Sequence, residues 1–208
     1  MELSIYNISG TETGKKAMLS DDVFKVEPND HAIYLDVKQH LANKRQGTHS
    51  AKEKSQISGS TKKLHRQKGT GGSRKGSIKS GTFVGGARIH GPRPRDYSFK
   101  LNKKLKQLAR KSALSYKVKE NNLTVLESFN MDTPKTKDYM NMLNNLKLNN
   151  QKTLLVIDDY NENIYKSGRN IVGAKIMAAR DLNTYEILNA STLILTDKAV
   201  PVIENILN

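Results

Sequence analysis

Residues 153–196, TLLVIDDYNENIYKSGRNIVGAKIMAARDLNTYEILNASTLILT, decide the fold class of this chain. Helical spacing predicts short helices near 161–167 and 184–188. Apolar segments that alternate with helices indicate βαβ units, so we expect an α/β fold with a layered, mainly parallel sheet and flanking helices. Three segments have the length and composition of strands: Thr153–Ile157, a stretch within 172–178, and Thr192–Leu195.

The same alternation continues on both sides of this segment. Upstream, Leu123–Leu126 is another apolar run of strand length, and residues 135–148 carry apolar side chains at helical spacing. Downstream, the apolar residues between 200 and 207 predict a final helix. The last ninety residues are therefore expected to form most of one sheet and its helices.

The amino-terminal residues show apolar patterns that predict one strand and one helix. Leu3, Ile5 and Ile8 indicate a strand. Asp30 stands where the N-cap of a helix is expected, and apolar residues follow at helical spacing until the pattern ends at Asn43. This helix leads directly into a segment of different composition.

A second helix is expected where that segment ends, and its two sides differ in chemistry. Leu114 and Val118 depart from the pattern because they fall on the basic side. We therefore expect this helix to pack one side and expose the other. One arc of the helical wheel holds Leu101, Leu105, Leu108, Ala109, Ala113 and Tyr116, and the other holds Lys100, Lys103, Lys104, Arg110, Lys111 and Lys117.

The chain has a formal charge of +15, and one segment carries all of this excess. Residues 44–119 hold 22 Lys and Arg but only Glu53 and Asp96 as acids, whereas the other 132 residues hold 13 bases and 18 acids. Residues 44–95 also hold 10 of the 14 glycines and one aromatic side chain, Phe83. So few apolar side chains cannot offset the conformational entropy that folding removes.

This composition predicts an extended loop within a folded domain. We expect residues 1–43 and 97–208 to form one globular α/β domain, and residues 44–96 to be a loop inserted in it. The loop should be extended or disordered until a polyanionic partner orders it.

Several classes of protein are excluded or disfavoured. The chain has no cysteine, which excludes disulfide scaffolds and thiol chemistry. No apolar run approaches the length of a membrane span, and the start MELSIYNISG lacks the features of a secretory signal. We therefore expect no membrane association.

The usual enzyme motifs are also missing. Residues 69–76 fit neither glycine-rich phosphate-loop template, and the five histidines lack metal-ligand spacing. Asp158 and Asp159 follow the apolar run 153–157, where they are expected to form a turn and cap the next helix. We predict no catalytic residue, metal or cofactor. The alternative is a magnesium-dependent enzyme that handles phosphoryl groups through Asp158 and Asp159.

The basic loop is instead predicted to bind RNA. Lys and Arg neutralise phosphates, and an irregular glycine-rich loop suits the crevices of folded RNA better than the groove of a DNA duplex. A merely solvated loop and a DNA-binding chromosomal protein are the alternatives. The predicted RNA-binding residues are Lys44, Arg45, Lys52, Lys54, Lys62, Lys63, Arg66, Lys68, Arg74, Lys75, Lys79, Arg88, Arg93, Arg95, Lys103, Lys104, Arg110 and Lys111.

Motifs along the whole chain resemble one family. They are Arg45-Gln46-Gly47-Thr48, Arg66-Gln67-Lys68-Gly69-Thr70-Gly71, Gly76-Ser77-Ile78, Gly91-Pro92-Arg93-Pro94-Arg95-Asp96-Tyr97, Leu101-Asn102-Lys103-Lys104 and Thr133-Pro134-Lys135-Thr136. In order and spacing they are similar to those of the large-ribosomal-subunit protein four family of bacteria.

This resemblance implies a structural protein of the cytoplasmic ribosome, whose globular domain lies on the outside of the large subunit. Its loop would enter 23S ribosomal RNA and support subunit assembly. The implied partners are this RNA, neighbouring ribosomal proteins and the nascent peptide, with no homo-oligomer. The loop tip implied to line the peptide exit tunnel, near the site where macrolides bind, is His65, Arg66, Gln67, Lys68, Gly69, Thr70 and Gly71.

The tip departs from the family pattern at two positions. The family often has an aromatic residue where His65 stands and a base where Gly72 stands, while Lys75 adds a base nearby. We therefore expect RNA binding with a different set of contacts at the tip.

Overall fold

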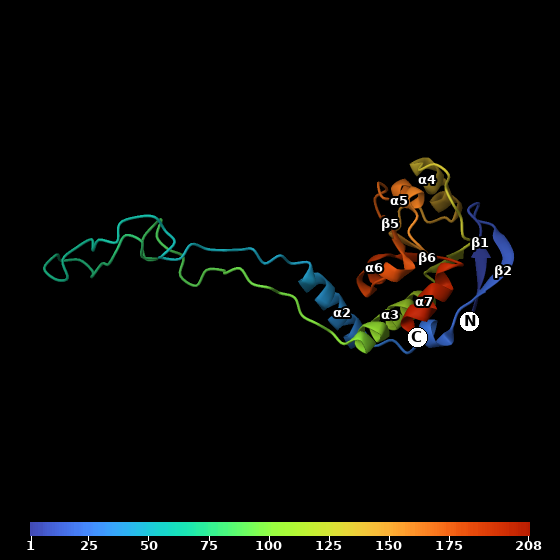
Figure 1. The fold of residues 1–208 in the computed structure, drawn as a ribbon, viewed down its shortest axis with the longest axis horizontal. Coiled ribbons are helices and arrows are strands. Elements are labelled where there is room, and N and C mark those ends of the chain that lie inside the picture. Colours follow the sequence, from blue (N-terminus) through green and yellow to red (C-terminus); the bar gives the residue numbers. More distant parts are fainter. The chain divides into compact units, whose positions relative to one another are not determined.

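The computed structural model describes residues 1–208 and confirms the predicted α/β class (Figure 1). Six strands form one sheet in the order β2-β1-β3-β6-β4-β5. Only the pair β1–β2 is antiparallel, so the sheet is mainly parallel, as predicted. The strands are β1 (Glu2–Tyr6), β2 (Glu12–Met18), β3 (Leu123–Leu126), β4 (Thr153–Ile157), β5 (Ala174–Ala178) and β6 (Thr192–Thr196).

Helices connect the parallel strands and follow the sequence pattern closely in the carboxyl-terminal half. Figure 1 shows α4 and α5 on one side of the sheet and α3 and α7 on the other. The helices are α1 (Asp21–Phe24), α2 (Asp30–Asn43), α3 (Lys103–Lys119), α4 (Thr136–Asn145), α5 (Glu162–Gly168), α6 (Thr184–Asn189) and α7 (Ala199–Leu207), with a 3-10 turn, η1 (Ala179–Asp181).

The central strands are buried on both faces, which explains their continuous apolar runs. In β4, Leu154 and Val156 pack into one core cluster with α3, α6 and α7. Leu155 and Ile157 point the other way, into a second cluster with α4 and α5. All five residues of β4 are buried, so the sheet separates two apolar cores.

The chain divides into two compact units. Residues 1–41 and 100–208 form the first, which contains the sheet and both core clusters, and we call it the body. Residues 42–99 form the second, which we call the arm. No arm residue belongs to either core cluster, so the body has a complete core of its own.

The amino-terminal part differs from the sequence prediction in three ways. The first strand ends at Tyr6, and Ile8 lies in the following turn. Strand β2 and the short helix α1 were not predicted. Asn29 is the N-cap of α2 in place of Asp30, because its Oδ1 accepts a hydrogen bond from the backbone N–H of Ala32 at 2.9 Å.

Helix α3 also packs differently from the predicted arc. Leu114 is fully buried in the first core cluster, although it falls on the basic side of the helical wheel. Lys117, predicted on the solvent side, is 7% exposed and donates from Nζ to the carbonyl oxygen of Ala190 at 2.8 Å. A second bond to the carbonyl oxygen of Ser191, at 3.4 Å, helps to compensate the ammonium, which allows a lysine to lie in a buried position.

Replacing Leu114 tests the role of α3 in the body. Leu114→Ala should lower the free energy of unfolding by about 2–5 kcal/mol, because it removes a fully buried side chain and leaves a cavity. Urea unfolding followed by circular dichroism measures this change. The matched control is Leu64→Ala in the arm, where the side chain is 41% exposed and the change should stay within about 0.5 kcal/mol. Equal effects at the two positions would contradict this packing.

Candidate nucleic-acid interface

The arm consists of two lengths of chain that run side by side in opposite directions, without a helix or strand between residues 44 and 102 (Figure 1). Hydrogen bonds join the two legs at several points along the arm. The first joins residues 47 and 95 at the base, and the last joins residues 64 and 76 near the tip. The leg-to-leg bonds are Arg95 N–H to Gly47 O at 3.1 Å, Ala51 N–H to Pro92 O at 2.9 Å, Arg88 N–H to Lys52 O at 3.1 Å, Ser77 Oγ–H to Ser60 O at 2.8 Å, and Leu64 N–H to Gly76 O at 3.1 Å.

The arm has too few acids to neutralise its own bases. Glu53 forms an ion pair with Arg93, with 2.5 Å between Oε1 and a guanidinium nitrogen. The Asp96 carboxylate accepts from the N–H of Ser98 at 2.8 Å and from its hydroxyl at 2.7 Å, which lowers the pKa of Asp96. Both acids are thus engaged, and most of the positive charge stays uncompensated.

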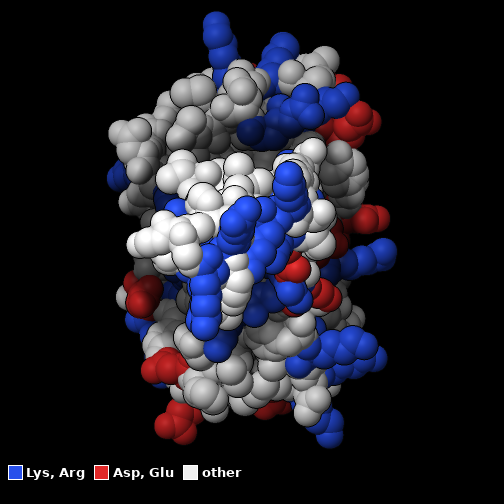
Figure 2. Space-filling view, turned by 90° about the vertical axis from the view of Figure 1, so that its left-hand side faces the viewer, with Lys and Arg blue, Asp and Glu red and all other residues white.

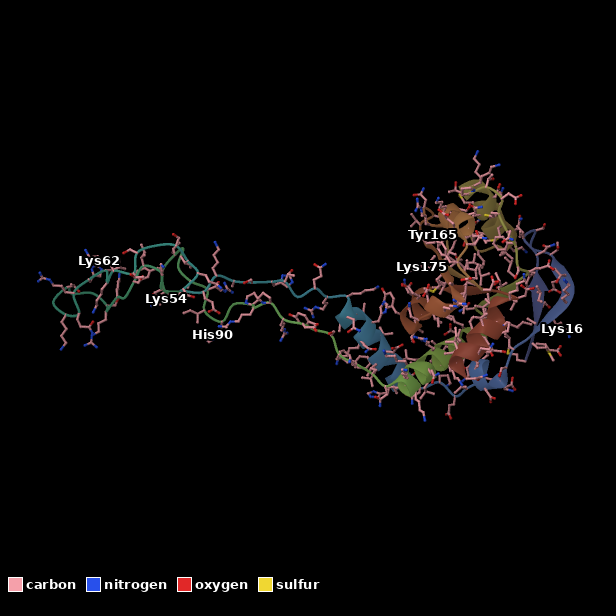
Figure 3. The ribbon with its side chains drawn as sticks, viewed as in Figure 1. Lys16, Lys54, Lys62, His90, Tyr165 and Lys175 are labelled. Carbon is pink, nitrogen blue, oxygen red and sulfur yellow. The ribbon has the colours of Figure 1, made fainter.

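The basic side chains lie on the surface of the arm. Figure 2 shows Lys and Arg side chains gathered on the surface nearest the viewer with few acids among them. Figure 3 shows Lys54 and Lys62 extending away from the arm backbone. Of the predicted RNA-binding residues in the arm, Lys75 and Lys79 are half-buried and the rest are exposed.

The turn between the legs contains the predicted tip. All residues from His65 to Gly71 are exposed, and the ammonium of Lys63 donates to the side-chain oxygen of Gln67. Gly69 and Gly71 have φ angles of +82° and +67°, which only glycine adopts readily. The tip therefore presents basic and amide groups with no apolar packing of their own.

A hollow of about 650 Å³ lies within the arm. It is lined by polar and charged side chains from both legs, among them Glu53, Lys54 and Lys79. The hollow is open to solvent on a basic surface, so a phosphate or a base edge can enter it.

The base of the arm carries an aromatic residue, Tyr97, that was not among the predicted site residues. The guanidinium carbons of Arg45 and Arg95 lie 3.8 and 4.4 Å from the ring centroid of Tyr97. A hydrogen bond from Arg95, helped by both positive charges, lowers the pKa of the Tyr97 hydroxyl. Tyr97 ends the motif 91–97, which was the only sequence signal for it.

The second group of predicted RNA-binding residues lies in the body, on α3. Lys103 and Lys104 are exposed in its first turn. Arg110 and Lys111 are half-buried, and Nε of Arg110 is buried without a hydrogen-bond partner. The start of α3 is therefore more accessible to a large partner than its middle.

Asp158 and Asp159 do not form the predicted cap. They lie in the turn after β4, where Oδ1 of Asp159 accepts from the N–H of Tyr160. Asn161 caps α5 instead, because its side chain accepts from the backbone N–H groups of Asn163 and Ile164. No group of three or more His, Cys, Asp or Glu side chains that could hold a metal ion occurs in the structure.

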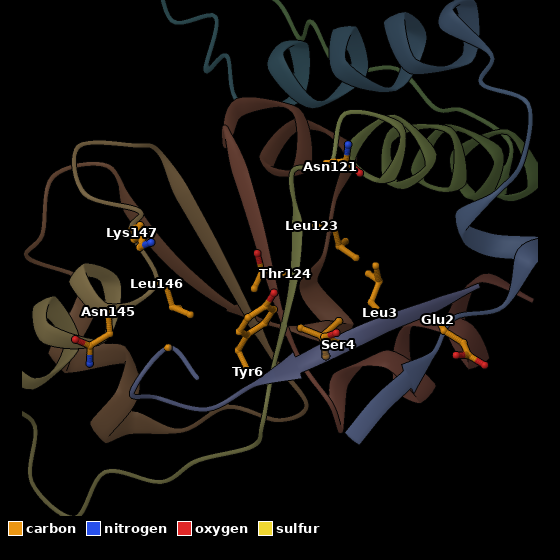
Figure 4. A pocket seen from close by; sticks show the side chains of 12 residues that line it. Glu2, Leu3, Ser4, Tyr6, Asn121, Leu123, Thr124, Asn145, Leu146 and Lys147 are labelled. Carbon is orange, nitrogen blue, oxygen red and sulfur yellow. The ribbon is translucent and has the colours of Figure 1, made fainter. Parts of the chain in front are cut away.

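A cavity of about 590 Å³ lies in the body beside β1 and β3 (Figure 4). Tyr6 and Thr124 line it from the two strands, and Leu146 lines it from the loop after α4. Its charged members are Glu2, which pairs with Lys16, and Lys147. The Tyr6 hydroxyl donates to Glu12 Oε1 at 3.1 Å, and this bond to a carboxylate raises the pKa of Tyr6, so the cavity presents no activated nucleophile.

Comparison with known proteins gives a consistent result along the whole chain. Residues 17–206 match the model of the ribosomal protein L4/L1 family. The large ribosomal subunit protein uL4 of Phocaeicola vulgatus is 58% identical over 208 residues, and that of Cytophaga hutchinsonii is also 58% identical over 208 residues, covering 100% of both chains in each case. The uL4 protein of Bacteroides thetaiotaomicron is 56% identical over 207 residues. None of the helices combines the length and apolar character needed to cross a bilayer.

Gly47 tests whether the legs are held together at the base of the arm. A Cβ atom at this residue would lie 2.0 Å from the carbonyl oxygen of Arg95, and its φ is +65°. Gly47→Ala should therefore break the bond from the Arg95 N–H and speed its hydrogen exchange about fivefold, since such a bond contributes about 1 kcal/mol.

Gly69→Ala is the matched control. Gly69 also has a positive φ, but nothing lies within 4 Å of its added Cβ. Its replacement should leave the exchange of the Arg95 amide unchanged. Unchanged exchange in both variants would contradict the leg-to-leg contact at Gly47.

Proposed function

The chain belongs to the ribosomal protein L4/L1 family and is a structural component of the large ribosomal subunit in the cytoplasm, and we propose that it acts there by inserting its arm into 23S ribosomal RNA. The observation that carries this proposal is the basic segment 44–119, with 22 Lys and Arg and two acids. Both acids are engaged within the arm, so the compensating charge has to come from a partner.

The form of the arm supports folded RNA as that partner. Its irregular legs expose basic side chains together with backbone and hydroxyl donors. A regular helix or two-stranded ribbon enters the major groove of DNA, whereas folded RNA offers phosphates and unpaired bases in crevices. The exposed bases Lys103 and Lys104 at the start of α3 extend the proposed interface to the body.

The proposed function has three further parts. Binding of the arm would order RNA segments and so support assembly of the subunit. The tip, residues 65–71, would help line the peptide exit tunnel and meet the nascent peptide there. The body, with its less basic surface, would contact neighbouring ribosomal proteins as a single copy.

We also propose that the protein is not an enzyme. The metal-dependent alternative rested on Asp158 and Asp159, and no third ligand accompanies them in the structure. The cavity of the body likewise holds no activated nucleophile, because the carboxylate of Glu12 raises the pKa of Tyr6.

Deleting part of the arm tests the RNA-binding role. A variant lacking residues 48–90 should keep the circular dichroism spectrum of a folded body, because both core clusters lie outside the arm. Its affinity for a 23S ribosomal RNA transcript should fall about a hundredfold or more, with a weaker dependence on salt, because most phosphate contacts are lost. A filter-binding titration at several salt concentrations measures both. Unchanged RNA affinity, or equal competition by duplex DNA against the full chain, would refute the proposal.

Reversing charge at the tip tests the tunnel role. Large subunits assembled with Arg66→Glu or Lys68→Glu should show altered chemical reactivity of tunnel RNA, because an acid repels the phosphates that the base would contact. The unfolding midpoint of the isolated protein should stay the same, since the tip has no core contacts. Lys137→Glu, on the exposed surface of α4, makes the same charge change in the body and should leave tunnel RNA unaltered. Identical reactivity in tip variants and wild type would contradict a tunnel position.

A further inference from the structure

The contact at the base of the arm joins three side chains from both legs. Arg45 belongs to the outgoing leg, and Arg95 and Tyr97 belong to the returning leg. Their guanidinium carbons lie 3.8 and 4.4 Å from the ring centroid. Both cations lie within the roughly 6 Å at which a guanidinium is attracted to an aromatic ring. The Tyr97 ring therefore contacts both arginines.

Neither arginine is neutralised by a carboxylate. Glu53 is paired with Arg93, and the Asp96 carboxylate is turned toward Ser98. Stacking uses the flat face of a guanidinium and leaves its N–H edge open to an acceptor. Each guanidinium carries five N–H donors, so its edge can bind acceptors while its face contacts the ring.

We propose that Tyr97 is a positioning residue that holds Arg45 and Arg95 as a clamp for two phosphate groups of one RNA strand at the base of the arm. This inference rests on the proposed RNA-binding function. The planar fork of arginine matches the oxygens of a phosphate, and holding it against a ring removes rotamer freedom before the RNA arrives. Each guanidinium presents its own set of N–H donors, so each can bind a different phosphate.

The same geometry argues against direct stacking of an RNA base on Tyr97. Two guanidiniums already contact the ring, so a stacked base would have to compete with them for it. The close approach of the legs adds support, because a Cβ at Gly47 would lie 3.1 Å from the ring carbons of Tyr97. The clamp therefore acts through the positive charges of Arg45 and Arg95, which Tyr97 holds in position. The Tyr97 side chain itself carries no charge.

The experiment compares full-length variants in binding to a 23S ribosomal RNA transcript over a range of salt concentrations. Tyr97→Ala changes no charge, yet it should weaken binding about fivefold to tenfold and reduce the slope of log K against log salt by about one. Each phosphate contact contributes about 0.7–0.9 to that slope. Tyr97→Phe keeps both stacking faces and should restore the wild-type slope.

Two further comparisons separate positioning from general damage. In a protein that already carries Arg45→Ala and Arg95→Ala, adding Tyr97→Ala should change neither affinity nor slope, because nothing is left to position. Tyr160→Ala removes an exposed aromatic ring of the body, outside the proposed interface, and should leave the slope unchanged.

The outcomes distinguish the clamp from the wider proposal. Failure of the wild-type protein to bind the transcript would refute the RNA-binding function and the clamp together. Wild-type binding with an unchanged affinity and slope for Tyr97→Ala would overturn the clamp alone. Weaker binding with an unchanged slope would also overturn it, since the ring would then contact the RNA directly.

Discussion

Uncompensated positive charge in a segment that has no apolar core is the constraint on which this structure depends. The arm cannot gain stability by burying side chains, and its two acids are already engaged with Arg93 and Ser98. Close packing of the remaining bases would only increase their mutual repulsion. The apolar cores therefore form in the body. The arm stays an open hairpin with hydrogen bonds between its legs rather than a globular unit.

The body, unlike the arm, is stabilised by buried apolar side chains, because its sheet has a complete core on each face. Alternate residues of β4 and β6 supply both cores, so neither face depends on the arm. Helices α2 and α3 hold the two ends of the arm, and α3 contributes Leu114 to the core and Lys103 to the proposed interface. One helix thus belongs to the stable part of the protein and also extends its binding surface.

The sequence predicted the fold class because the central strands are buried on both faces and so appear as continuous apolar runs, as in Thr153–Ile157. It failed where tertiary contacts override local pattern. Strand β2 contains Gly14, Lys15 and Lys16 and has one buried residue, Ala17, so no alternation marks it. Lys117 is buried because a distant backbone carbonyl accepts from its ammonium, which no helical wheel can indicate.

The sequence likewise predicted part of the candidate site, namely its basic residues, and missed the contacts between them. Charge density identified the basic residues, and their contacts with RNA stay a prediction. The contact of Tyr97 with both Arg45 and Arg95 could not be predicted, because it depends on two legs that meet only after the chain has turned back.

The lack of helix and strand in the arm has a consequence for the life of the protein before it joins a subunit. Extended, exposed backbone is the preferred substrate of proteases, while the body has the packed core that resists them. A copy that finds no RNA would be cut between its two folded segments. The arm is thus the part of the free chain where proteolytic cleavage is expected first.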